Sequence, residues 1–544
     1  MGQKNTKKAL YGSRQIIGVD RKGGKYSRLI YDQLRLDKDF GRWASKKLAM
    51  KTVTKIKDGE ALAYYVKNRQ SRIRYNNMRS KSIEQNAPIW PSYYKMHKEQ
   101  QRTYPDGMIV EDYLAQNSLQ SMLERTVQRL LLVPGIQERI AEIKNKANGK
   151  KVTLTFRYKW GFDGTLGGSV YREGTGSGED NNVENILLSQ MAFLELRCLE
   201  TGELVTRNQF ANSASGMRPL RISFEPESVE NVRQEHERLT LEAAAVTPVD
   251  IEEGVSVEFE DFPTLFDGKA LAYIYGEASQ VCHLCGHGPV EMSIPGKAHP
   301  ITNEEGKRNG LTNLHAGPRF MEFCLHICYY LSWLHWSIRA ANEEERLGIE
   351  DRKCSAYWVL YFFLGIQVDK VKKTGGTSND GNTARVFFQN PELTADLLEL
   401  PREFVCALAL LWKLIRCTHE LDLEKVKLAV ERFKASFWGN FRDTSNTKRG
   451  RDGITWFYIA SSVHRLSEHL VELLEACPMP PGMLSEEGSE SNNKIVRFIR
   501  EHLTRKMSRR ETMEDLMHRL IAVSDPLVLH YNREEVLKHR AKKS

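Results

Sequence analysis

The chain has 544 residues, of which 41% are hydrophobic and 27% charged, so it is long enough for several folded domains. Its first fifteen residues hold no apolar segment of signal-peptide type, and its most apolar stretch (320–336) contains Glu322, His326 and His335, which argues against a membrane span. Nine cysteines, an odd number, favour a reducing compartment over a disulfide framework.

The charge is distributed unevenly along the chain. Residues 1–102 carry 25 Lys and Arg against 8 Asp and Glu, and residues 494–544 carry 13 against 7. Because the net charge is only +9, the middle of the chain is acidic. Basic ends around an acidic middle predict a polyanionic partner, such as nucleic acid. A basic tail without a specific partner is the alternative interpretation.

The first part of the chain is basic and helical in pattern. Residues 1–60 are compatible with a small DNA-binding module, and residues 61–82 ("ALAYYVKNRQSRIRYNNMRSKS") predict a basic helix. A link rich in Pro and Tyr (87–107) follows. Apolar residues at helical spacing then predict one long amphipathic helix over 117–146.

The pattern changes to period two at 151–164 ("KVTLTFRYKWGFDG"), which predicts a strand with one buried face. Further strands are expected at 186–199, 220–226 and 255–268, with a helix at 227–246 before the last of them. Strand, strand, strand, helix and strand indicate an α/β or α+β core.

The pattern from about 300 to 470 is almost entirely helical, interrupted by polar loops at 372–384 and 442–453. A helical block of this length indicates an inserted domain rather than a linker. A strongly basic helix is expected to begin at Lys494. We therefore expect six regions, with boundaries at 1–60, 61–150, 151–280, 281–475, 476–525 and 526–544.

Three carboxylates stand at junctions between expected elements. Asp163 ends the first strand on its polar side, Asp267 ends the fourth strand, and Glu490 precedes the basic helix. Carboxylates that converge in this way can hold two Mg²⁺ ions for attack on phosphodiesters. The alternative is that both aspartates are turn residues and that Glu490 caps a helix.

"VCHLCGHGPVEM" (281–292) contains half of a zinc site, Cys282 and Cys285, with no second C-x-x-C nearby. His464 and His469 have zinc-finger spacing and are candidates for the other half. One zinc ion on all four would tie the end of the last strand to the approach to Glu490. The alternatives are free buried thiols with unrelated histidines, or His283 and His287 as local ligands.

The basic helix after Glu490 is a candidate phosphate-facing surface, although a solvated face is the usual reason for such a charge run. The candidate DNA-binding side chains are Lys494, Arg497, Arg500, Arg505, Lys506, Arg509 and Arg510.

Several segments, in the same order, resemble the Transib family of DNA transposases and, more distantly, the catalytic core of the V(D)J recombinase. The segments are "YKWGFDGTLGGSVYR" (158–172), "LFDGKALAYIYGEASQVCHLCGHGPVEM" (265–292), "GLTNLHAGPRFMEFCLH" (310–326), "HRLSEHL" (464–470) and the stretch 486–528. The similarity covers about 85–530. Residues 1–60 match only in being basic.

The resemblance implies an α/β RNase H-like core, split by a large, mostly helical zinc-binding insertion, with helical N- and C-terminal regions. It implies a metal triad of Asp163, Asp267 and Glu490, in which Glu490 is preferred over Glu486 and Glu487 because it directly precedes "SNNK". It also implies a zinc site of Cys282, Cys285, His464 and His469, and a homodimer that pairs two DNA ends. Pro318, just after the Leu-His-Ala segment, leaves the start of that helix open.

The expected function is that of a nuclear cut-and-paste DNA transposase that depends on Mg²⁺, with Mn²⁺ as a substitute. It would nick DNA at terminal inverted repeats, form hairpins on the flanking DNA and join the 3′-ends to target DNA. No membrane partner and no small-molecule substrate are expected. The alternatives are a domesticated DNA-binding protein that does not cleave, and a zinc-stabilised scaffold of chromatin.

Overall fold

The computed structural model describes residues 54–166, 185–278, 280–294, 296–330, 342–371, 377–441 and 459–541. The chain divides into two compact units after Gln101. The expected module at 1–60 lies almost wholly outside the described residues. The sequence-based boundary at 150 differs from the observed division, since residues 102–150 belong to the same unit as the sheet.

The described part of the first unit consists of three helices, α4 (Asp58–Lys67), α5 (Arg72–Glu84) and α6 (Tyr93–Gln101). The single basic helix expected at 61–82 is therefore two helices. The break occurs at Arg69, which has a positive φ of 48°, and Ser71 restarts the chain by accepting a hydrogen bond from the amide of Arg74. The rings of Tyr65, Tyr75 and Tyr93 pack edge to face and join the helices.

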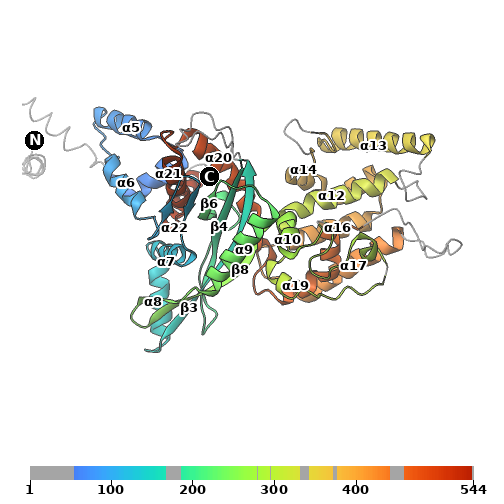
Figure 1. Ribbon diagram of the computed structural model, residues 1–544, viewed down its shortest axis with the longest axis horizontal. Helices are drawn as coiled ribbons and strands as arrows, with labels where there is room; N and C mark the ends of the chain where they lie inside the picture. Colours follow the sequence, from blue (N-terminus) through green and yellow to red (C-terminus); the bar gives the residue numbers. More distant parts are fainter. Residues whose placement is uncertain are drawn as a thin grey trace, which may run out of the picture. The chain divides into compact units, whose positions relative to one another are not determined.

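The second unit contains a mixed sheet of eight strands among its described residues, in the order β1-β2-β6-β4-β3-β8-β7, with β5 paired to β4 (Figure 1). β3 is antiparallel to β4 and parallel to β8, and β4 is antiparallel to β6. The four expected strands are all present. The strands are β1 (Ile109–Val110), β2 (Leu114–Gln116), β3 (Val152–Leu166), β4 (Asn185–Cys198), β5 (Leu204–Arg207), β6 (Arg218–Ser223), β7 (Val249–Glu252) and β8 (Val255–Leu265).

The two faces of β3 have different roles, as the alternation predicts. Trp160, on the apolar face, lies near His236 of helix α9 (Val229–Ala244), which crosses the sheet in front of it in Figure 1. The polar face carries Lys159, Asp163 and Thr165, and it meets the returning C-terminal part of the chain. Helix α9 therefore lies on one face of the sheet. The C-terminal part of the chain meets the other, polar face, where a site can form.

The long helix expected at 117–146 is two helices, α7 (Leu119–Leu130) and α8 (Ile136–Lys146). Pro134 and Gly135, the latter with a φ of 86°, separate them, because proline lacks an amide hydrogen and glycine adopts the left-handed region without strain. The buried residues of both helices, including Leu123 and Ile140, belong to the core of the sheet.

Between the last strand and the C-terminal helices, the chain forms a helical block with its own hydrophobic core (Figure 1). Among the described residues, no helix is long and apolar enough to cross a membrane. The polar loop at 442–453 lies outside the described residues. The elements are α10 (Gly268–Tyr275), α11 (Pro289–Met292), η2 (Glu305–Asn309), α12 (Asn313–Tyr330), α13 (Glu343–Leu364), α14 (Gly381–Phe387), α15 (Pro391–Leu397), α16 (Arg402–Ile415), α17 (Leu423–Phe441), α18 (Ser461–His464), η5 (Arg465–His469) and α19 (Leu470–Glu475).

The chain then returns to the sheet through η6 (Pro481–Leu484), α20 (Glu487–His502), α21 (Arg509–Val523) and α22 (Pro526–Ala541). The basic helix expected from Lys494 begins at Glu487 instead. Glu490 consequently lies in its first turn and not in the segment before it. Pro318 stands inside α12, whose start at Asn313 is fixed from outside the helix, as described below.

Candidate functional site: a carboxylate pocket and a Cys/His cluster

Asp163 lies on the polar face of β3, which continues to Leu166 rather than ending at the aspartate. Its Oδ2 accepts a hydrogen bond of 2.7 Å from the side-chain amide of Asn493 on α20. Gly164 follows, and a Cβ there would lie 2.6 Å from Oε2 of Glu227. Asn493 therefore packs against Asp163, and Glu227 packs against the neighbouring Gly164.

Asp267 lies just beyond β8 and is the N-cap residue of α10. Its Oδ1 accepts a hydrogen bond of 2.7 Å from the amide of Ala270. The cap fixes the carboxylate at the junction of strand and helix, and the helix N-terminus stabilises its negative charge. The alternative interpretation made Asp267 a turn residue and gave the capping role to Glu490, whereas the structure has Asp267 as the cap. The same position brings its carboxylate close enough to Asp163 to act on it.

Three glutamates near the start of α20 have different surroundings. Glu486 is buried and accepts hydrogen bonds of 3.0 and 2.9 Å from the amides of Asn313 and Leu314, so it holds the start of α12. Glu487 forms an ion pair with Arg385 at 2.8 Å. Glu490 is exposed, and its Oε2 lies 3.8 Å from Nε2 of His315. Glu490 is therefore the one of the three without a structural role in these contacts.

Asp163, Asp267 and Glu490 line one pocket of about 320 Å³ between the sheet, α12 and α20. The pocket is acidic along these three residues and Glu227, and basic at Lys494 and Arg497. Its lining residues are Phe162, Asp163, Gly164, Glu227, Leu265, Asp267, Leu314, His315, Glu486, Ser489, Glu490, Asn493, Lys494 and Arg497.

The carboxylates of the pocket repel one another. Burial raises the pKa of Asp163 to about 7, and the Asp267 carboxylate adds to the effect, whereas the hydrogen bond from Asn493 opposes it. A bound cation would reduce the repulsion between these carboxylates, and carboxylate oxygens are ligands that Mg²⁺ prefers. Asp163, Asp267 and Glu490 are the residues that could hold divalent ions here. Their oxygens are less closely gathered than the ligand atoms of the Cys/His cluster. Among the described residues, the groups of three or more ligating side chains whose atoms all lie within 4.8 Å of one another consist of Cys and His alone.

The candidate DNA-binding side chains divide into two sets. Lys494 and Arg497 are exposed and line the pocket, and Arg497 donates to Oγ1 of Thr165 at 2.8 and 3.1 Å. Arg510 is also exposed, but it does not line the pocket.

The other four side chains of the set interact with residues of the protein itself, which corrects the expectation that all seven face phosphate. Arg500 is buried over the ring of Phe224, and Arg509 is buried against the rings of Tyr113 and Phe224. Arg505 forms ion pairs with Glu511, Glu514 and Asp515, and the Nζ of Lys506 donates to the carbonyl of Arg500. Burial depends on tertiary packing, which a charge run cannot reveal.

Three residues that the sequence analysis did not assign line this pocket or support the segment ahead of α20. Asn493, three residues after Glu490 and so on the same helix face, orients Asp163. His315 lies beside Glu490. Lys159 is fully buried and donates to Oδ1 of Asn212 at 2.7 Å and to the carbonyls of Met483 and Ser485 at 2.9 and 2.6 Å. The sequence could have indicated this role, because Lys159 lies on the polar face of β3, four residues before Asp163.

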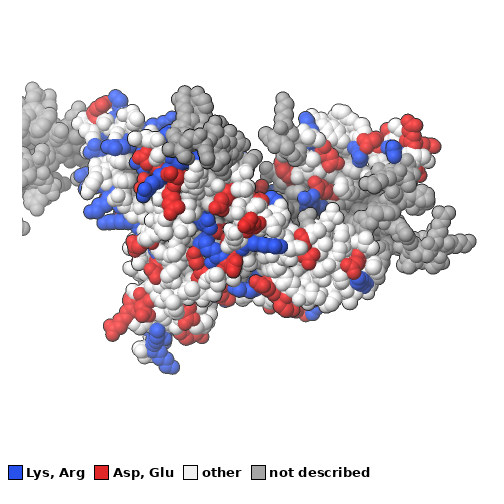
Figure 2. Space-filling model, viewed as in Figure 1, with Lys and Arg blue, Asp and Glu red and all other residues white. Residues whose placement is uncertain are grey.

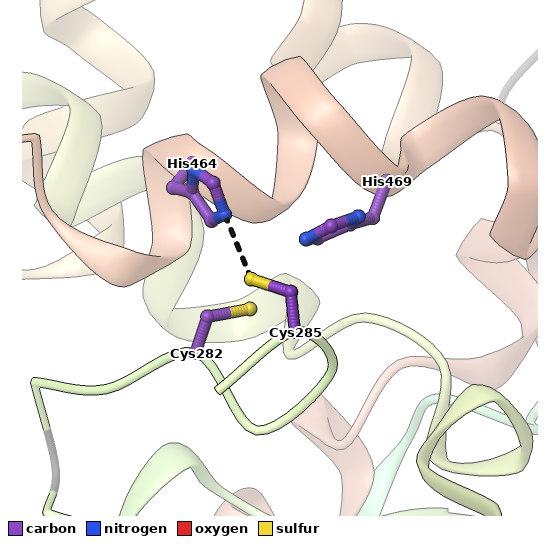
Figure 3. A group of neighbouring side chains, drawn as sticks. All are labelled: Cys282, Cys285, His464 and His469. Carbon is purple, nitrogen blue, oxygen red and sulfur yellow. Dashed lines mark hydrogen bonds between the residues drawn. The ribbon is translucent and has the colours of Figure 1, made fainter. Parts of the chain in front are cut away.

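Cys282, Cys285, His464 and His469 form a buried cluster whose ligand atoms all lie within 4.8 Å of one another. Figure 3 shows the two cysteines on a loop and the two histidines on the helix above it, with all four side chains directed to a common point. Sγ of Cys285 lies 3.4 Å from Nε2 of His464. Zinc bonds of about 2.3 Å to sulfur and about 2.0 Å to nitrogen give a sulfur–nitrogen separation of about 3.5 Å in a tetrahedron.

The chemistry of the cluster fits a metal such as zinc. His469 is completely buried, and neither of its ring nitrogens has a hydrogen-bond partner among the described residues. Unpartnered buried nitrogens are costly unless something binds them. The pKa of the Cys282 thiol is well below its usual value, because the Cys285 thiol and the two histidines interact with its sulfur. A thiolate is the form that binds a metal.

The spacing of the two histidines depends on an irregular helix. Residues five apart in an α-helix point about 140° away from each other. The π-helical turn η5, between α18 and α19, brings His464 and His469 onto one face instead. The local competitors have other positions: His283 stacks on Tyr275, and His287 pairs with His299 through Nδ1 atoms 2.7 Å apart, near Cys285.

Comparison with protein-family models finds no match, and a search of curated proteins also finds none. The function is therefore argued from the residues of the site themselves.

Proposed function

We propose that this protein is a cut-and-paste DNA transposase of the type that its resemblance to the Transib family implies. The observation that carries the proposal is the pocket itself. Asp163, Asp267 and Glu490 come from a strand, a helix cap and a helix separated by hundreds of residues, and they line one cavity. Lys494 and Arg497 at the same cavity provide positive charge for a phosphate backbone.

The fold supports the proposal. Antiparallel β3, β4 and β6, with β8 parallel beside β3, suit the RNase H-like core that the resemblance implies. The helical block interrupts this core between α10 and η6. The Cys/His cluster joins the beginning of the block to its end, so a structural zinc ion would close the insertion at its base.

The residues of the pocket have separate tasks in this proposal. Two Mg²⁺ or Mn²⁺ ions on Asp163, Asp267 and Glu490 would supply an activated nucleophile and neutralise the charge that develops on the phosphate. Asn493 holds the orientation of Asp163, and the cap of α10 holds Asp267. Lys494 and Arg497 bind the backbone on either side of the scissile phosphate, which aligns it for in-line attack.

The reaction proceeds by phosphodiester exchange. Water hydrolyses one phosphodiester bond at the end of the element. The nick leaves a 3′-hydroxyl on the flanking DNA and a 5′-phosphate on the element. This hydroxyl attacks the opposite strand, which forms a hairpin on the flanking DNA and releases the element with its own 3′-end. That 3′-hydroxyl then attacks target DNA. Each step exchanges one phosphodiester bond for another after the first hydrolysis, so no covalent protein intermediate is needed. We further propose that a homodimer pairs the two ends in the nucleus.

The test is cleavage of end-labelled DNA that carries the element's terminal repeat, in Mg²⁺. Wild-type protein should nick the repeat boundary and convert nicks to hairpins. Asp163→Asn, Asp267→Asn and Glu490→Gln should each lower the rate at least about 100-fold, because removing a metal ligand removes the transition-state stabilisation that the ion supplies. Glu487→Gln is the matched control, because it lies on the same helix but pairs with Arg385.

Equal cleavage by Glu490→Gln and Glu487→Gln would refute the assignment of the triad. DNA that is bound at the repeat but remains uncut with wild-type protein in both Mg²⁺ and Mn²⁺ would instead favour the domesticated, non-cleaving protein. Binding without preference for a terminal repeat would favour the chromatin scaffold.

A further inference from the structure

A second charged site lies away from the carboxylate pocket, beneath the start of α22. Arg129 on α7 forms an ion pair with Asp525 at 2.7 Å, and both side chains are buried. Arg218 on β6 is also buried, at 1% exposure, and the negative charge of Asp525 acts on it. Two buried guanidinium groups therefore share one buried carboxylate.

The hydrogen bonds of Asp525 go to groups other than the second arginine. Its carboxylate accepts hydrogen bonds from Nε and Nη2 of Arg129 at 2.7 and 3.0 Å. Its Oδ1 also accepts from the amides of Leu527 and Val528, both at 3.1 Å, and so caps α22. Oδ1 thus accepts from three donors and Oδ2 from one, and none of the four belongs to Arg218.

Arg218 is left with an unsatisfied group. Its Nη1 donates to the carbonyl of Ser524 at 3.0 Å, and its Nε lies 3.2 Å from the sulfur of Met122. Its Nη2 is buried and has no hydrogen-bond partner among the described residues. Burial lowers the pKa of Arg218 to about 10, so the side chain still carries its charge at neutral pH. An unpaired buried charge is expensive, which indicates a missing anionic partner.

Arg218 lines a cavity of about 100 Å³ between α7, the end of β5 and α22. Arg533 and His530, both on α22, line the same cavity, as do Asn208 and Gln209. None of the residues that line it carries a carboxylate. Arg207 also lines it, but this side chain is paired with Glu195 at 2.9 Å. The space suits one small ion and is well below the roughly 300 Å³ of typical organic-ligand pockets.

We propose that this cavity binds one phosphate group, with Arg218 as the buried anchor and Arg533 as the second cation. The phosphate is either a free oxyanion or a backbone phosphate of DNA. The site does not depend on the proposed cleavage activity, because none of its residues lines the carboxylate pocket.

The first test is thermal unfolding of the full-length protein in inorganic phosphate, compared with chloride at equal ionic strength and without divalent ions. Phosphate should raise Tm by about 2 °C or more and saturate, because it binds only the folded state. Arg533→Gln should raise the half-saturating phosphate concentration about tenfold, as expected for one lost charge-assisted hydrogen bond. Arg540→Gln, exposed on the same helix, is the matched control and should change nothing.

Arg218→Met should abolish the effect of phosphate on Tm, and Arg533→Gln carries the test alone if this buried substitution does not fold. A DNA-binding arm distinguishes the two sources of phosphate. If a backbone phosphate occupies the cavity, Arg533→Gln weakens DNA binding more than Arg540→Gln does. If a free oxyanion occupies it, the two variants bind DNA equally while phosphate still raises Tm. No phosphate-specific rise in Tm, together with equal DNA binding by the two variants, overturns the proposal.

Discussion

Asp163 illustrates how a single side chain can be unfavourable for the free protein and useful for its function. The carboxylates of Asp267, Glu227 and Glu490 act on it, and a hydrogen bond from Asn493 compensates in part. Its pKa of about 7 lies above the value of 3.8 expected for an unfolded chain. The folded protein therefore binds this proton more tightly than the unfolded chain does.

The raised pKa of Asp163 makes the stability of the folded protein depend on pH. Without divalent ions, the contribution of Asp163 is fully favourable below pH 4 and is lost as the pH rises through about 7, because the folded state must then hold an ionised carboxylate. Asp163→Asn removes this pH-dependent loss of stability, because asparagine does not ionise. We expect the variant to exceed wild type by about 4 kcal/mol in free energy of unfolding at pH 8 in EDTA, and to equal it near pH 4. Urea unfolding at the two pH values measures this, and a constant difference would contradict it.

His469 is fully buried, and its ring nitrogens have no hydrogen-bond partner among the described residues, which is the environment of a metal ligand. Replacing it with asparagine should lower the zinc content of the purified protein by about one equivalent per chain. It should also make the protein several kcal/mol less stable, because binding energy at a structural zinc site is also folding energy. Zinc analysis and thermal unfolding with and without a chelator measure both effects. His326→Asn, exposed on α12, is the control. Unchanged zinc content in His469→Asn would exclude the site.

At the scale of elements, the joint between η6 and α20 determines where Glu490 lies. Lys159 donates to the carbonyls of Met483 and Ser485, just ahead of the helix that carries Glu490. Glu486 links the same joint to the start of α12, where His315 follows two residues later. These contacts connect the sheet, the insertion and α20 beside the pocket.

Lys159→Met should therefore reduce both stability and DNA cleavage. It leaves three buried acceptors without a donor, which costs about 2–4 kcal/mol of free energy of unfolding. The rate of nicking should fall while DNA affinity stays the same, because Lys159 positions Glu490 and does not contact DNA. Lys151→Met, at an exposed position ahead of the same strand, should lie within about 0.5 kcal/mol of wild type. A fully stable and active Lys159→Met variant would rule out this role.

The sequence predicted strands well and helix boundaries poorly, for physical reasons. The period-two pattern of β3 reports burial of one face directly, so its polar face and the position of Asp163 could be anticipated. The breaks at Arg69 and Pro134, and the early start of α20, depend on caps and turns that periodicity does not detect. The spacing of the two histidines suggested their pairing with the two distant cysteines, and the resemblance implied the same four ligands. The π-helical turn that makes the pairing possible could not be anticipated, because H-x4-H on a regular helix would point its rings apart.

At the scale of the whole molecule, positive charge is concentrated in the N-terminal unit. On the face shown in Figure 2, Lys and Arg predominate over α5 and α6, whereas acidic and basic side chains are interspersed over the sheet domain and the insertion. This distribution is compatible with a division of labour in which the N-terminal region supplies much of the backbone contact and the pocket supplies the chemistry.

The salt dependence of DNA binding tests this division. Neutralising the exposed Arg74 and Lys95 of the first unit should reduce the slope of log K against log salt by about 2, because each phosphate contact contributes about 0.9. The control removes two exposed lysines of the insertion, Lys425→Gln and Lys427→Gln, and should leave the slope unchanged. Fluorescence anisotropy at several salt concentrations gives both slopes. Equal slopes for the two double variants would show that the first unit does not contact the backbone.

The most direct test of metal-dependent cleavage at the pocket is a change of metal preference at Asp163. Asp163→Cys replaces a hard oxygen ligand with a softer sulfur, which binds Mn²⁺ better than Mg²⁺. We expect this variant to lose nicking at the repeat boundary in Mg²⁺ and to regain part of it in Mn²⁺, whereas Glu487→Gln nicks in both. Nicking by Asp163→Cys at the wild-type rate in Mg²⁺ would contradict a metal-ligand role for Asp163 and, with it, the proposed transposase.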